Sequence, residues 1–190
     1  MPNLRYSTPQ LWVETVLADL DTFLIDHAAA EKKASGMAIS MLSHYPDKPE
    51  LVKAMIDLSI EEMTHFREVV KIMAARGVQL QADTRDSYVN QLRKHMRQGS
   101  ELYMLDRLLI AGIIEARGCE RFGLVAQGLP EGELKGFYKA ITESEARHQE
   151  LFEELALLYF PEAVVTARMD ELLDAEAQIC AALPIMCALH

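Results

Sequence analysis

One pattern occurs twice in this chain and constrains its fold more than any other feature. A glutamate is followed about thirty residues later by a second glutamate, with a histidine three positions beyond it. The first copy is Glu31, Glu62 and His65, and the second is Glu115, Glu145 and His148. Residues at i and i+3 share one face of a helix, so each Glu-x-x-His pair can give a carboxylate and an imidazole to one metal ion. Two such copies predict a carboxylate-bridged dimetal site inside a four-helix bundle.

Apolar residues recur with the 3.6-residue period of an α-helix along almost the whole chain, and no segment alternates in the manner of a strand. Turn-forming residues at 44–49, 77–86, 128–132 and 161 divide this pattern. We expect four long helices at 9–43, 49–76, 99–127 and 130–160, a short helix at 84–97, and a last one over 162–184. The six residues of the repeated pattern lie within the apolar stripes. The sequence therefore predicts an all-α four-helix bundle, with extra helices in the crossover between the second and third helices and at the C-terminal end.

The composition is that of one globular domain covering residues 1–190. With 190 residues, 50% of them hydrophobic, the chain is long enough to bury one substantial core and too short for a second domain to be expected. There is no apolar run of the length that a membrane-spanning helix needs, and no secretory signal at the start. We therefore expect a soluble, cytoplasmic protein that does not bind membranes. The three cysteines, Cys119, Cys180 and Cys187, form no C-x-x-C pair and are expected to be reduced thiols.

The donor set of the repeated pattern favours iron or manganese. Four buried glutamates would repel one another strongly, whereas two divalent cations make the ligand set formally neutral. Mixed carboxylate and imidazole ligation suits these metals better than one that prefers thiolates. A single Glu-x-x-His match is weak evidence, because about 0.6 matches are expected by chance among 19 glutamates and six histidines. Two copies in register with apolar stripes are hard to explain as solvated helix faces. His27, one turn before Glu31, is either a partner of a metal ligand or a satisfied core histidine.

The chain is acidic overall, with a formal net charge of −10, so any contact with nucleic acid must be local. The clearest concentration of basic residues lies between the second and third long helices. Its candidates for phosphate contacts are Arg85, Arg93, Lys94 and Arg97. Such a run is often only a solvated surface. Further candidates beside the metal helices are Lys32, Lys33, Arg117 and Arg121.

Several stretches resemble the tRNA 2-methylthio-isopentenyladenosine hydroxylases of the MiaE type, which belong to the ferritin-like di-iron superfamily. These stretches are Glu31 to Ala34, Glu61 to Phe66, Met104 to Phe122 and Ser144 to His148. The Glu-x-x-His pair is shared by the whole superfamily, whereas the run from Met104 to Phe122 is similar to this family in particular. The similarity extends over nearly the whole chain.

The resemblance implies a dinuclear iron monooxygenase that uses O2 to hydroxylate the isopentenyl group of a modified adenosine next to the tRNA anticodon. It also implies tRNA as the substrate and an external electron donor such as a reductase or ferredoxin-like protein. Glu62 and Glu145 would bridge or chelate the ions, Glu31 and Glu115 would be terminal ligands, and His65 and His148 would each hold one iron. We expect a monomer or small homo-oligomer. The alternatives are an iron-storing ferroxidase, a peroxide-reducing protein and a radical-generating reductase subunit.

Overall fold

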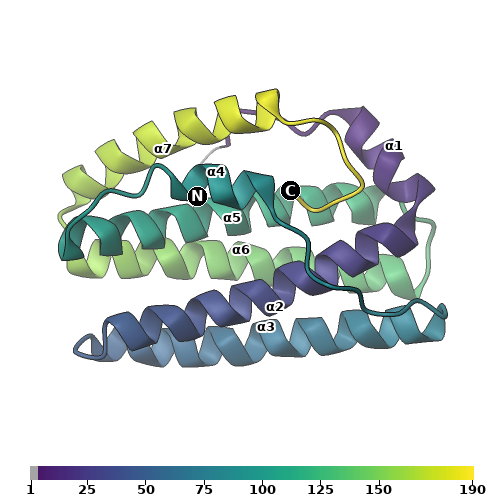
Figure 1. The fold of residues 1–190 in the computed structure, drawn as a ribbon, viewed down its shortest axis with the longest axis horizontal. Coiled ribbons are helices and arrows are strands. Elements are labelled where there is room, and N and C mark those ends of the chain that lie inside the picture. Colours follow the sequence, from purple (N-terminus) through teal and green to yellow (C-terminus); the bar gives the residue numbers. More distant parts are fainter. Residues whose placement is uncertain (1–3) are drawn as a thin grey trace. The chain divides into compact units, whose positions relative to one another are not determined.

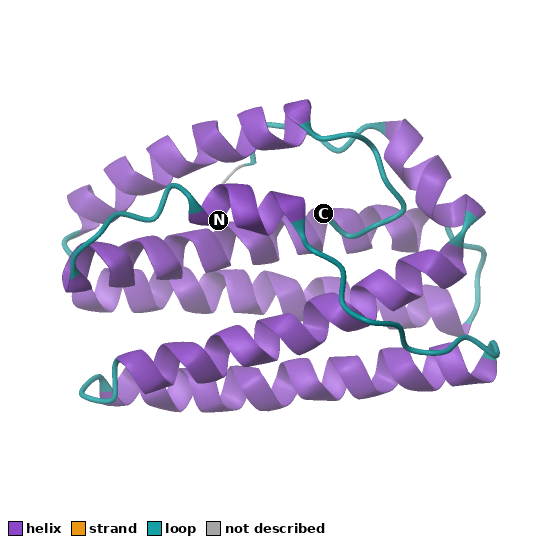
Figure 2. Cartoon of the chain, in the orientation of Figure 1, coloured by secondary structure: helices purple, strands orange, loops and turns teal. Residues whose placement is uncertain are grey.

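The structure is a computed structural model that describes residues 4–190, and within this range it contains seven helices and no strand (Figure 2). The helices are α1 (Gln10–Ala18), α2 (Leu20–His44), α3 (Pro49–Ala75), α4 (Ser87–Arg93), α5 (Ser100–Gly128), α6 (Glu133–Tyr159) and α7 (Glu162–Ala182). The prediction of an all-α chain is confirmed. None of the described helices is long and apolar enough to cross a membrane.

The described residues fall into two compact units, and each unit is considered by itself below. Unit 1 contains the residues up to Leu17, then Arg85–Met186, and His190. Unit 2 contains Ala18–Thr84 and Cys187–Leu189. Each unit holds one copy of the repeated glutamate and histidine pattern. The prediction of a single domain stays a prediction.

Unit 2 is built on α2 and α3, which run side by side as a hairpin (Figure 1). Pro49 occupies the first turn of α3, where its missing N–H costs no helical hydrogen bond. At the other end of α3, Gly77 adopts a φ of 75°, and the Val78 N–H donates to the Met73 carbonyl over 2.9 Å. This left-handed cap favours glycine and ends the helix close to the predicted boundary. Fully buried apolar residues between the two helices include Leu24, Ala38, Met41, Leu51, Met55 and Val69.

The first long helix was predicted to be continuous, and this prediction is wrong. The structure divides it into α1 and α2 at Asp19, whose backbone is not helical (φ −141°, ψ 66°). The Asp19 carboxylate accepts hydrogen bonds from the backbone N–H of Thr22 over 3.1 Å and from its hydroxyl over 2.8 Å. An aspartate that caps new N–H groups in this way makes a helix start favourable inside an otherwise helical pattern.

Unit 1 is organised around α5, which packs against α4, α6 and α7. The helix is buried on nearly every side from Met104 to Ala126, unlike the predicted one-sided stripe. It lies close to α6 at Gly112, where an added Cβ would lie 3.3 Å from the Cβ of Phe152. This contact is tighter than usual, so a larger residue at Gly112 would require Phe152 to shift by a few tenths of an ångström.

Two buried acids tie other segments of unit 1 to α5 through arginines. The first is Asp106, which is fully buried and accepts hydrogen bonds from Arg97 and Arg168 over 2.7–3.0 Å. Arg168 also donates to the backbone carbonyl of His95 over 2.6 Å. This cluster fastens the segment before α5, and α7 as well, to α5. The helix predicted at 84–97 is shorter in the structure than in the prediction. Helix α4 starts after the capping residue Asp86 and ends at Arg93.

The second buried acid is Glu176 of α7, which pairs with Arg117 of α5, and neither side chain is exposed at all (0% for both). The Arg117 Nε donates to Glu176 over 2.8 Å, and the Tyr88 hydroxyl and Cys180 thiol donate to the same carboxylate over 3.1 and 3.0 Å. Arg117 also pairs with Glu120. The Arg117 side chain is therefore a structural cation, and its suggested contact with nucleic acid is wrong.

Candidate metal centre

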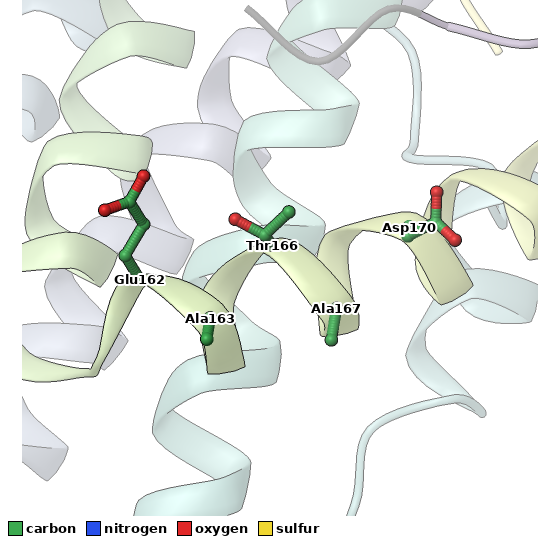
Figure 3. Close-up of a pocket in the computed structure, with 5 residues that line it drawn as sticks. All are labelled: Glu162, Ala163, Thr166, Ala167 and Asp170. Atoms are coloured by element: carbon green, nitrogen blue, oxygen red, sulfur yellow. The ribbon is translucent and has the colours of Figure 1, made fainter.

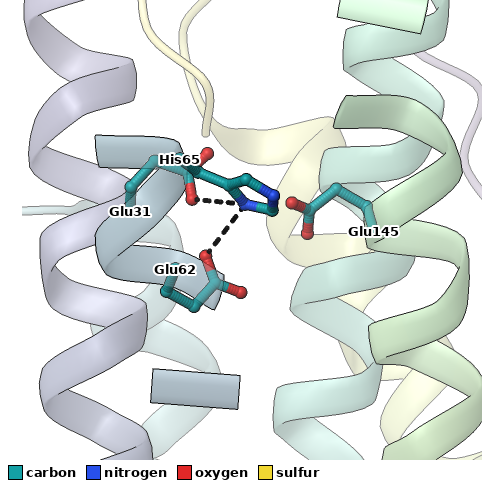
Figure 4. A group of neighbouring side chains, drawn as sticks. All are labelled: Glu31, Glu62, His65 and Glu145. Atoms are coloured by element: carbon teal, nitrogen blue, oxygen red, sulfur yellow. Dashed lines mark ion pairs between the residues drawn. The ribbon is translucent and has the colours of Figure 1, made fainter. Parts of the chain in front are cut away.

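The first copy of the pattern forms a cluster in unit 2, between α2 and α3. Glu31 and Glu62 are buried, with 3% and 1% of their surface exposed, and His65 is mostly covered. The His65 Nδ1 lies 3.6 Å from Glu31 Oε2 and 3.6 Å from Glu62 Oε2 (Figure 4). Figure 4 also draws Glu145, which belongs to unit 1 and is described with that unit. We call Glu31, Glu62 and His65 the first triad.

His27 lies one helical turn before the first triad and is completely buried. Its Nε2 is 2.6 Å from Glu31 Oε1, a hydrogen-bond distance. Burial, together with the charge of His65, lowers the pKa of His27 to about 3. A neutral His27 can therefore donate its Nε2 proton to Glu31 and fix the direction of that carboxylate. This geometry combines both sequence interpretations, since His27 is a core histidine and also a partner of a candidate ligand.

The second copy forms a cluster in unit 1, between α5 and α6. Glu115, Glu145 and His148 are all buried, with 6%, 4% and 3% exposure. Each offers one ligand atom, and these atoms lie within 4.8 Å of one another. The His148 Nδ1 is 3.8 Å from Glu145 Oε2. We call these three residues the second triad.

Two neighbours of the second triad were not singled out from the sequence as site residues. Ser144 is buried, and its Oγ lies 3.5 Å from His148 Nε2 while accepting a hydrogen bond from Arg147 over 3.1 Å. Its spacing of four residues from His148 was the available signal, because i and i+4 share a helix face. Cys119 is half-buried, and burial with the charge of Glu145 raises its pKa. It therefore stays a neutral thiol, which is a poor metal ligand.

The two triads have the same construction, and their donor chemistry fits iron. Each takes one glutamate from one helix and a Glu-x-x-His pair from the helix packed against it, as the sequence predicts. Oxygen and imidazole donors of this kind suit iron and manganese. Buried carboxylates placed within ångströms of one another are strongly unfavourable without a cation.

The predicted nucleic-acid residues differ in their surroundings. Arg85, Arg93 and Lys94 have exposed side chains around α4. Arg97 is partly covered, because it is paired with the buried Asp106. Two further candidates, Lys32 and Lys33, reach the Asp83 carboxylate and the Thr84 carbonyl, respectively. Arg121 is 8% exposed, with its guanidinium carbon 5.0 Å from the centre of the Trp12 ring. Like Arg117, it is a core residue and not a surface contact.

A surface hollow of about 530 Å³ lies on the exposed side of α7 (Figure 3). It is lined by Glu162, Ala163, Thr166, Ala167 and Asp170. Two carboxylates and small side chains make it unsuitable for phosphate. None of its lining residues belongs to either triad, so the hollow is not the metal centre.

Comparison with known proteins gives a consistent result. The model of a family described as tRNA-(MS[2]IO[6]A)-hydroxylase (MiaE) matches residues 2–190. The chain is 39% identical over 168 residues to a tRNA 2-(methylsulfanyl)-N(6)-isopentenyladenosine(37) hydroxylase of Pseudomonas putida, covering 88% of this chain and 81% of that protein. It is 34% identical over 131 residues to the protein of the same name in Salmonella typhimurium, covering 69% of this chain and 48% of that protein.

Among solved structures, the chain is similar to a Synechococcus protein described as having aldehyde deformylating oxygenase activity. The TM-score is 0.89 and the sequence identity 36%, over 93% of this chain and 88% of the other. This likeness confirms the prediction of a ferritin-like fold class.

Proposed function

The chain belongs to the tRNA-(MS[2]IO[6]A)-hydroxylase (MiaE) family, and on this premise we propose that it hydroxylates the isopentenyl group of 2-methylthio-isopentenyladenosine beside the tRNA anticodon. Membership confirms the resemblance seen in the sequence. The observation that carries the proposal is the pair of equivalent buried triads, each with a Glu-x-x-His helix and a glutamate from its packing partner. A purely structural helical pair has no need of three buried metal-type donors in one place.

We propose that the two triads together hold two iron ions and that residues 1–190 form a single domain. Glu62 and Glu145 would bridge or chelate the ions, Glu31 and Glu115 would be terminal ligands, and one histidine would serve each ion. His27 would hold Glu31 in its ligating orientation through the 2.6 Å hydrogen bond. When bound, reduced iron supplies the electrons and the coordination position with which O2 is activated.

The overall reaction requires two electrons from outside the site. One oxygen atom of O2 enters the C–H bond as a hydroxyl, and the other leaves as water with two protons and two electrons. A reductase or ferredoxin-like protein is the class of donor that we expect. Leu58 and Phe152 each lie one helical turn from a triad residue on the same helix and are buried, so they would help to keep bulk water from the reactive centre.

We further propose that Arg85, Arg93 and Lys94 contact tRNA phosphates. They are exposed, and the modified base lies in a single-stranded loop that a protein can approach without opening a duplex. Arg97 would contribute less, because its guanidinium already neutralises Asp106. Its main role would be to hold the basic segment in place.

The activity is tested by incubating reduced, iron-loaded protein with O2 and tRNA carrying the modified adenosine. Mass spectrometry of the nucleosides should show a gain of one oxygen atom, and metal analysis should give about two irons per chain. Glu145→Ala should lose both properties. Glu150→Ala is the matched control, because Glu150 lies on the same helix and is exposed. Full hydroxylation by iron-free protein, or by Glu145→Ala, would refute the proposal.

The tRNA contacts are tested with the triple variant Arg85→Ala, Arg93→Ala, Lys94→Ala. Each lost phosphate contact should reduce the slope of log affinity against log salt by about 0.7–0.9. Arg97 is left unchanged in this variant, because its removal would leave the buried Asp106 with Arg168 as its only arginine partner among the described residues. The control is Arg67→Ala with Lys71→Ala, which removes two exposed cations paired with Glu68. Equal affinities and slopes in wild type and triple variant would exclude this surface.

A second candidate activity is aldehyde deformylation, favoured by the likeness to the Synechococcus protein. Ferroxidase and peroxide-reducing functions are two further alternatives on the same ligands. All three can be followed with the same iron-loaded protein, by supplying a fatty aldehyde, Fe(II) with O2, or hydrogen peroxide instead of tRNA. Turnover with one of these and none with tRNA would reassign the function.

A further inference from the structure

Gln149 is a buried polar residue next to the second triad. It follows His148 on α6, and only 4% of its surface is exposed. Its side-chain Nε2 makes no hydrogen bond to any residue that the structure describes between positions 4 and 190. Buried amides almost always have a partner, so this one requires an explanation.

The position of Gln149 on α6 places it with the metal-type residues. It is four residues after Glu145 and three before Phe152, and this spacing puts all three on one helix face. That face is packed against α5 near Gly112, where an added Cβ would be 3.7 Å from the Gln149 carbonyl. The glycine belongs to the same helix as Glu115 and lies one turn before it. The backbone contact shows that this part of α6 faces α5, and Gln149 lies there one helical turn after Glu145 of the second triad.

An apolar side chain at such a position would make the fold more stable than an amide without a partner. Met has nearly the same length as Gln and leaves no polar atom without a partner. The same helix face does carry apolar residues where packing alone is required, as at Ile141 and Phe152. A buried donor without a protein partner, close to candidate metal ligands, is expected where a bound molecule accepts its hydrogen bond.

We propose that the Gln149 amide donates a hydrogen bond to a small oxygen-bearing ligand that binds beside the second triad when iron occupies it. This inference rests on the proposed metal function of that triad. The amide N–H would orient the ligand without changing charge, because a carboxamide does not titrate. Gln149 would therefore contact the bound small ligand and would not be an additional metal ligand.

The test uses Gln149→Met with Gln178→Met as the matched control, since Gln178 is an exposed glutamine on α7. The first measurement is the melting temperature of the iron-free proteins. Removing an unpartnered buried amide should raise the melting temperature by about 2–8 °C in Gln149→Met, whereas the control should barely change. A lower melting temperature for Gln149→Met would show that the amide has a structural partner, and would overturn the inference.

The second measurement is the binding of azide to the oxidised, iron-loaded proteins, followed by its visible absorption band. Azide is the probe because it is a small anion that can occupy a ligand position and accept a hydrogen bond. Loss of one neutral hydrogen bond should weaken azide binding about 3–10-fold in Gln149→Met. Iron content should stay at that of wild type. Unchanged azide affinity at equal iron content would overturn the inference and leave the proposed function intact, whereas failure of the wild-type protein to bind iron would refute the proposed function itself.

Discussion

The buried pair of Arg117 and Glu176 allows a quantitative prediction for the substitution Glu176→Ala. The pair has no exposed surface, and Glu176 accepts from Arg117 over 2.8 and 3.1 Å. Removing one partner of a buried ion pair costs about 3–5 kcal/mol, because the other charge stays buried without compensation. Glu120 would still contact Arg117, so we expect the lower end, about 3 kcal/mol. For a chain of this size, this corresponds to a melting temperature lower by about 6–12 °C.

The assay is urea unfolding followed by circular dichroism, with calorimetry for the melting temperature. The double variant Arg117→Met, Glu176→Leu removes both charges, and we expect it to be more stable than Glu176→Ala. Glu171→Ala is the matched control on α7, since Glu171 is 65% exposed and pairs with Arg168 at the surface. The Glu171→Ala substitution should lower the free energy of unfolding by less than about 1 kcal/mol. A loss under about 1 kcal/mol for Glu176→Ala, or a double variant less stable than the single one, would refute this account of the network.

Three further predictions concern single residues. Glu115→Ala should lose tight binding of at least one iron while the helical circular dichroism spectrum is retained, and unchanged metal content by mass spectrometry would remove Glu115 from the ligand set. Burial alone would raise the pKa of Asp106, but hydrogen bonds from Arg97 and Arg168 outweigh it and hold that pKa below its usual range. The ionised form of Asp106 therefore stabilises the fold above the pKa of the unfolded chain, and this contribution is lost as the pH falls through the lower native pKa. Urea titrations from pH 7 to 2 should show this loss in wild type and a smaller one in Asp106→Asn; identical curves would contradict it. Asp19→Ala should cost about 1 kcal/mol in urea unfolding through loss of the α2 cap, and no measurable cost would mean that the cap is not needed.

The long helices and the residues of both triads could be predicted because they follow a local rule. In α3 the stripe Leu51, Met55, Leu58, Glu62, His65 and Val69 steps by three and four, and all of these residues are buried except His65, whose side chain is 12% exposed. A titratable residue within such a stripe is buried because the apolar residues on the same helix face are buried. This holds whichever element packs against that face. The equal construction of the two triads then follows from the repeat itself.

The helix breaks were predicted less well, because they depend on caps that compete with a continuous apolar pattern. Asp19 is followed by Leu20 and Asp21, which are compatible with an uninterrupted helix. Only the hydrogen bonds from Thr22 show that Asp19 starts a new one. The same holds for α4, where Asp86 caps a helix of only seven residues. The periodic pattern gives the face of a helix more reliably than its ends.

The different roles of the charged residues in α5 could not be predicted from the sequence alone. Asp106, Glu115 and Arg117 are all buried on one helix. From the sequence, Glu115 was predicted to be a metal ligand and Arg117 a contact for nucleic acid, and Asp106 was not singled out. The structure separates them by their partners, which come from distant parts of the chain: Arg168 for Asp106 and Glu176 for Arg117. An acid paired with arginine is already neutralised within the protein, so a second cation would be repelled there. Glu115 instead lies within ligand distance of another glutamate and a histidine, where a metal cation would lower the energy of all three donors. The choice of partner, more than burial, therefore distinguishes the structural acids of this chain from those that we propose to bind iron.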